Sequence, residues 1–144
     1  MRFVVLILGS GLLAGCGVIH AASPAQETAN FQGTWKMVSC VANGESETGD
    51  VRWIVEDDHY TIRLDGQSHV DPYTFKLDPS QKRIDVFHHD TPKGTYGGSL
   101  KGIYELKGDS LRVCYDLTGQ KYPKSFDAGR GSRQVVYEFR RERR

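Results

Sequence analysis

Cysteine, net charge and catalytic motifs are all scarce in this sequence. Only three cysteines occur in its 144 residues, and none of them has the Cys-x-x-Cys spacing that is typical of zinc and redox sites. Lys and Arg together number 19 and Asp and Glu 18, so no excess of one charge would draw the chain to nucleic acid. No Gly-x-Ser-x-Gly turn is present to expose a nucleophilic serine. We therefore expect a protein that is not an enzyme, needs no cofactor and binds no nucleic acid.

Histidine provides the strongest candidate for metal binding or acid–base chemistry, in the run His88-His89-Asp90. Neighbouring residues of a strand point to opposite faces, so His88 and His89 would not bind one ion from a regular strand. The other candidate histidines are His59 and His69. Because a zinc site needs several converging ligands, we expect no metal site. A catalytic role would require His88 or His89 to share a cleft with Asp90 or Glu105.

A strongly apolar run lies at the N-terminus. Arg2 precedes it, and it leads into Leu13-Ala14-Gly15-Cys16, which has the pattern of a bacterial lipobox. The run is shorter than the roughly 20 apolar residues that a membrane-spanning helix needs. We therefore predict that residues 1–15 are a lipoprotein signal peptide and that Cys16 carries the lipid that attaches the protein to a membrane. Secretory cleavage near Ala21-Ala22 and an uncleaved anchor are the alternatives.

The segment that follows Cys16 predicts both a location and a tether. Gly17, in place of an aspartate, resembles lipoproteins that are sent to the outer membrane, so we expect a lipid-anchored protein of the cell envelope that faces the periplasm. Residues 16–30 are rich in Ala, Ser and Gln and show no apolar periodicity. This composition is typical of a flexible tether. We place the folded domain at residues 31–144.

Short runs in which β-branched or aromatic residues alternate with polar ones predict strands along most of the domain. Turn dipeptides such as Asp65-Gly66, Asp78-Pro79 and Gly108-Asp109 separate several of these runs. We expect eight strands, at residues 34–41, 51–57, 59–64, 73–77, 83–88, 102–107, 110–115 and 134–141. Strands in this order either stack as a sandwich or close on themselves, and closure removes the exposed edges. The predicted fold is therefore all-β, an eight-stranded antiparallel up-and-down barrel.

A Gly-x-Trp motif opens the predicted domain, within Phe31-Gln32-Gly33-Thr34-Trp35-Lys36. Further motifs along the chain are Leu77-Asp78-Pro79 with Ile84-Asp85, Gly102-Ile103-Tyr104-Glu105-Leu106, Gly108-Asp109-Ser110-Leu111-Arg112-Val113-Cys114, and Pro123 with Phe126. Together these motifs resemble a lipocalin-like domain family of unknown function that is abundant in Planctomycetes, over nearly all of residues 31–142. The resemblance implies a lipocalin-type barrel and implies no particular reaction or ligand.

The resemblance also implies how the barrel closes. In lipocalin-like barrels the Trp of Gly-x-Trp closes the base, and an Arg or Lys from the last strand packs against it, an arrangement that cation–π attraction favours. Gly33 and Trp35 match the first part of this arrangement. By position on the last strand, Arg140 is the expected partner, with Arg141 as the alternative.

Cys40 and Cys114 form an even pair in a compartment that permits disulfides. On a regular strand Cys40 would face away from Trp35, whereas the alternation around Cys114 leaves its facing open. A disulfide and two separate buried thiols are therefore equally compatible with the sequence.

Two functional hypotheses remain. The first is a membrane-anchored lipocalin-like domain that binds a small apolar ligand inside the barrel, a role suggested by fold analogy alone. The second is a module that contacts an envelope protein through the rim loops of a filled barrel, at residues 90–99 and 117–133. A hollow apolar interior would favour the first hypothesis, and a packed interior the second.

Overall fold

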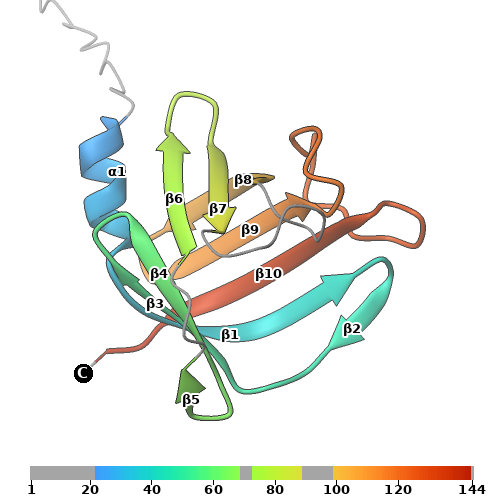
Figure 1. Cartoon of the computed structure of the whole chain (residues 1–144), viewed down its shortest axis with the longest axis horizontal. Helices are drawn as coiled ribbons and strands as arrows, with labels where there is room; N and C mark the ends of the chain where they lie inside the picture. The colour runs from blue at the N-terminus through green and yellow to red at the C-terminus, as the bar shows by residue number, and fades with distance from the viewer. Residues whose placement is uncertain (1–21, 69–72, 89–98, 144) are drawn as a thin grey trace, which may run out of the picture.

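The computed structural model of this chain is a β-barrel with one helix beside its base (Figure 1). It describes residues 22–68, 73–88 and 99–143. In chain order the elements are α1 (Pro24–Phe31), β1 (Gly33–Ala42), β2 (Glu45–Glu47), β3 (Val51–Glu56), β4 (His59–Leu64), β5 (Gln67–Ser68), β6 (Tyr73–Asp78), β7 (Arg83–His88), β8 (Ser99–Lys107), β9 (Ser110–Asp116) and β10 (Gln134–Arg141). All eight expected strands are present, and each begins and ends within three residues of its expected position.

Eight antiparallel strands close the barrel. Neighbouring strands follow the order β10-β9-β8-β7-β6-β4-β3-β1, and β1 then pairs with β10 from Trp35 and Arg141 to Ala42 and Val135. This closure confirms the predicted eight-stranded antiparallel barrel. The short strands β2 and β5 pair with β1 and β4 and were missed, because two or three residues carry no readable alternation.

We expected residues 16–30 to be a flexible tether. Helix α1 shows instead that the second half of this segment is folded. Ser23 caps the helix by accepting a backbone N–H of the first turn, and Pro24 occupies a first-turn position that suits proline. Glu27 and Phe31 lie on one face of the helix and are 4% and 2% exposed. Because only these two residues pack the helix against the barrel, the sequence shows no apolar stripe from which the helix could be predicted. The folded unit therefore begins before the expected boundary at Phe31.

The buried face of α1 fills the base of the barrel. The ring centre of Phe31 lies 5.8 Å from that of Phe75 and 5.2 Å from that of Tyr104. The Glu27 carboxylate accepts hydrogen bonds from the Lys82 ammonium at 2.7 Å and from the Tyr104 hydroxyl at 3.1 Å. These two donors offset the cost of burying the charge. Burial and then the Glu27 charge raise the pKa of Tyr104, which stays a hydrogen-bond donor.

Trp35 and Arg141 complete the base. The Arg141 guanidinium lies 4.1 Å from the centre of the Trp35 ring and donates hydrogen bonds to the carbonyls of Gln32 and Asn30, the latter at 2.7 Å. Trp35 is fully buried and donates from Nε1 to a carbonyl of α1 at 2.8 Å. Arg140, the partner expected by position, is exposed, because alternate residues of β10 point to opposite faces. The cation that covers Trp35 is therefore Arg141 and not Arg140.

The two remaining cysteines lie on opposite sides of the sheet. The pairing of β1 with β10 shifts register after Met37, and this bulge turns Cys40 to the same interior as Trp35. Cys114 directly precedes Tyr115, whose ring lies in the barrel core, so the Cys114 side chain points outward. Both cysteines are free and buried. The structure thus contains two separate thiols and no Cys40–Cys114 disulfide.

The long segment 117–133 lies against the barrel wall through Tyr122. The Tyr122 ring packs against the Arg83 guanidinium, 4.3 Å from the ring centre, and its hydroxyl donates to the Asp85 carboxylate at 2.8 Å. Both partners belong to β7, so the segment is held on the outer face of the sheet. Most of the other expected rim loop, residues 90–99, lies outside the described residues.

Candidate ligand-binding cavity

The barrel interior is packed at the base and hollow at the opposite end. At the base, Phe31, Tyr104 and Leu111 are at most 2% exposed. The hollow end contains a cavity of about 530 Å³, a size typical of pockets for small organic molecules. The interior is thus partly packed and partly hollow, because the helix and the large core side chains fill the base and leave the opposite end open.

Five aromatic side chains line the cavity, one from each of five strands: Trp53, Tyr60, Tyr73, Tyr115 and Tyr137. Trp53 stacks on Tyr60 with ring centres 4.7 Å apart, and Tyr60 stacks on Tyr73 at 5.1 Å. Tyr137 lies 5.8 Å from Trp53. Because each ring is braced by a neighbour across the sheet, the rings form a firm aromatic wall.

Aliphatic side chains complete the apolar lining: Met37, Val51, Ile62, Leu64, Leu100, Leu117 and Val135. Among the described residues, β4 pairs with β6 at His59 and Tyr60 and with β5 at Arg63 and Leu64. Leu64 and Leu117 are 39% and 38% exposed, so apolar surface continues from the cavity to the outside. An apolar molecule could therefore contact hydrocarbon along its whole path inward.

The Tyr115 hydroxyl is a buried polar group in the cavity wall. Tyr115 is 3% exposed, and its hydroxyl lies beside that of Tyr60, with which it shares a side-chain hydrogen bond. Burial raises the pKa of Tyr115 well above the usual value, so the hydroxyl stays protonated. The two hydroxyls thus place a polar position within an otherwise apolar wall.

The mouth of the cavity is acidic. Glu47, Asp50 and Asp65 line it, and the Asp65 N–H donates to the Asp50 carbonyl at 3.0 Å, which holds two of the three positions together. Arg52 forms an ion pair with Asp50, and this hydrogen bond lowers the pKa of that carboxyl. The charge of Glu47 reaches inside, since burial and then Glu47 raise the pKa of the Cys40 thiol.

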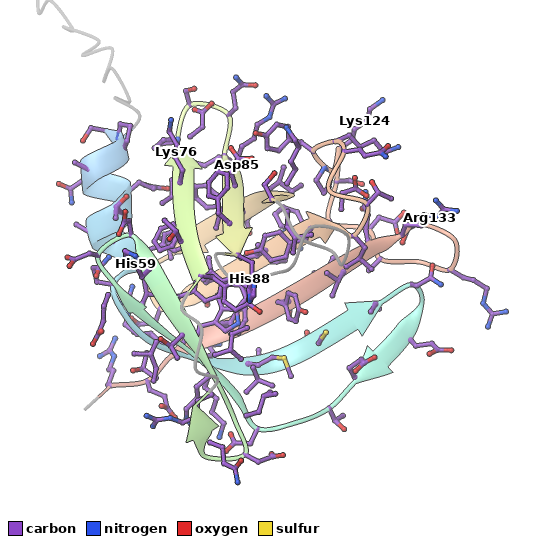
Figure 2. The ribbon with its side chains drawn as sticks, viewed as in Figure 1. His59, Lys76, Asp85, His88, Lys124 and Arg133 are labelled. Carbon is purple, nitrogen blue, oxygen red and sulfur yellow. The ribbon has the colours of Figure 1, made fainter. Side chains whose placement is uncertain are left out.

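Of the histidines proposed from the sequence, His59 and His88 are among the described residues. His88 lies at the end of β7 with its ring centre 4.9 Å from that of Tyr73 (Figure 2). Glu105 forms ion pairs with Lys107 and Arg112, away from the cavity lining. His59 pairs with the neighbouring Asp58, and His69, His89 and Asp90 lie outside the described residues. Within the described ranges, no group of three or more His, Cys, Asp or Glu residues is placed to hold a metal ion.

Sequence reasoning left open whether the barrel interior is packed or hollow, and it did not locate the cavity. It also missed the acidic mouth, because Glu47, Asp50 and Asp65 are far from a recognisable motif. The signal that was available was the excess of aromatic residues on inward positions, which is compatible with either a full or a hollow barrel.

Comparison with known proteins returned no match: no family model, no curated protein and no solved structure is similar to this chain. In the part of the chain that the structure describes, no helix is long and apolar enough to cross a membrane. Any inference about the function of this protein therefore starts from the cavity.

Proposed function

We propose that this protein is a membrane-anchored, lipocalin-like domain that binds a small apolar or amphipathic molecule in the cavity of its barrel. The observation that carries the proposal is the hollow half of the barrel, about 530 Å³ in volume and lined mainly by aromatic and aliphatic side chains. A barrel of eight strands is wide enough for one small ligand. Filling an apolar cavity of this size with hydrocarbon would supply most of the binding free energy.

The composition of the lining supports the same function. Most of the side chains that line the cavity are aromatic or aliphatic, and a few polar ones, including Glu47 and Thr48, lie among them. A binding cavity needs a few polar groups among apolar ones, since they orient the ligand.

The alternative, an interaction module that acts through its rim loops, has less support. It requires a filled barrel and free loops, whereas segment 117–133 packs on the barrel wall through Tyr122 and Asp85. The lipid anchor at Cys16 and the location in the envelope are parts of our proposal that depend on the sequence alone. Incorporation of labelled palmitate that is lost in Cys16→Ala would support them.

Native mass spectrometry of residues 22–144, exported to the envelope behind a cleavable signal peptide and purified from it, tests the binding function. This chain keeps every described element, and its cooperative unfolding is checked first. We expect a bound small molecule in a one-to-one complex. Leu100→Trp, which places a larger side chain in the cavity, should lose it, whereas Val38→Trp, at an outer position that is 56% exposed, should keep it. Complexes that survive Leu100→Trp unchanged would contradict a site in the barrel.

A further inference from the structure

We propose that the ligand is a cationic amphiphile, with an ammonium group at the mouth of the cavity and an apolar body against the aromatic wall. This inference rests on the proposed binding function and specifies the chemistry of the ligand. Among the described residues, the lining of the cavity includes the acidic Glu47, Asp50 and Asp65 and contains no Lys, Arg or His. A lining of one sign selects for the opposite charge in a ligand.

Two of these three carboxylates are available to a ligand. Asp50 is engaged by Arg52, but Glu47 and Asp65 form no ion pair with any described residue. An ammonium group at the mouth would be attracted by both carboxylates. An anionic head group would meet repulsion there from both carboxylates.

The interior is suited to the same ligand. Its aromatic and aliphatic lining would bury the apolar body of an amphiphile. The charge of Glu47 acts on this region as well, because it contributes, after burial and Cys40, to raising the pKa of Tyr137 to about 12. The lining thus favours the apolar body, and the mouth favours the cation.

The cavity is an independent sign of a ligand. It has a volume of about 530 Å³ and a lining that is mainly aromatic and aliphatic, so the acidic mouth is not the sole evidence for a site.

Three ligands with the same eight-carbon chain test the inference: octylammonium, 1-octanol and octanoate. Their dissociation constants for residues 22–144 are measured by calorimetry and by the fluorescence of Trp53, a cavity residue. We expect octylammonium to bind at least tenfold more tightly than 1-octanol, and octanoate to bind most weakly. Added salt should reduce the preference for the cation, because exposed charges are screened.

A charge-neutralised variant separates electrostatics from cavity shape. Glu47→Gln combined with Asp65→Asn should bring octylammonium to the affinity of 1-octanol and leave the affinity for 1-octanol unchanged. The matched control is Glu45→Gln combined with Asp57→Asn, which removes two exposed carboxylates that do not line the cavity. The control should keep the preference for the cation.

The outcomes distinguish the inference from the binding function on which it rests. Equal affinities for the three ligands, or tighter binding of octanoate, would overturn the inference and leave the binding function in place. Loss of the preference in the control pair as well as in the test pair would also overturn it, because the preference would then reflect net charge. Binding of none of the three ligands would count against both proposals.

Discussion

Replacement of Arg141 tests how the barrel base is held. Arg141→Ala removes the guanidinium that covers Trp35 and donates to the carbonyls of Asn30 and Gln32. Arg140→Ala is the matched control, because this neighbour is exposed and makes no described hydrogen bond to the helix. The two variants change net charge equally and differ only in the face of β10 that they alter.

The magnitude follows from the contacts that are lost. Hydrogen bonds from a charged donor contribute roughly 1.5–3 kcal/mol each and a cation–π contact roughly 0.5–2 kcal/mol. The Arg141 side chain is 24% exposed, so the lower end of each range applies, and its ion pair with Asp109 adds little. We expect Arg141→Ala to lower the free energy of unfolding by about 2–4 kcal/mol, and Arg140→Ala by less than about 0.5 kcal/mol.

Urea unfolding, followed by the fluorescence of Trp35 and Trp53, measures both values. Thermal melting should show the same order, with roughly 4 °C lost per kcal/mol in a domain of this size. Arg141→Lys should fall between the wild type and Arg141→Ala, since lysine keeps the charge and loses the fork of donors. Equal effects of the two alanine variants, or a loss below about 1 kcal/mol for Arg141→Ala, would refute this account of the base.

Three further predictions concern the thiols, a glycine and the buried hydroxyl. Burial raises the pKa of Cys114 to about 11 and also raises that of Cys40, so the thiolate fraction of both cysteines at pH 8 is low. Both cysteines should therefore resist iodoacetamide in the native protein and react after unfolding, and mass spectrometry should show no disulfide between them. Gly33→Ala should lower the free energy of unfolding in urea by about 1 kcal/mol more than Gly108→Ala. Both glycines have positive φ, but a Cβ at position 33 would lie 3.3 Å from Arg141 Nη1, whereas position 108 is open. Equal losses would contradict the close approach at position 33. Tyr115→Phe should lower the free energy of unfolding of the ligand-free protein by about 0.5–1.5 kcal/mol, because it removes the hydroxyl that pairs with Tyr60. An unchanged or higher value would mean that the two hydroxyls do not pair.

The sequence by itself determined where the strands lie and how they connect. Alternation has a period of two residues, and turn dipeptides such as Asp65-Gly66 fix where the chain reverses, so both features are readable from neighbours. The expected strand at residues 59–64 and that at 83–88 have the observed bounds. With eight such strands in meander order, closure into a barrel was a sound inference.

Only the tertiary structure decided which side chains meet. The bulge after Met37 depends on pairing with β10 and moved Cys40 to the interior, against the regular alternation. Helix α1 carries its signal in two buried residues, and Arg141 rather than Arg140 reached Trp35 because of the local facing of β10. The cavity and its acidic mouth have the same origin. They result from how far the packed base extends into the barrel, which is a property of long-range packing that no local pattern encodes.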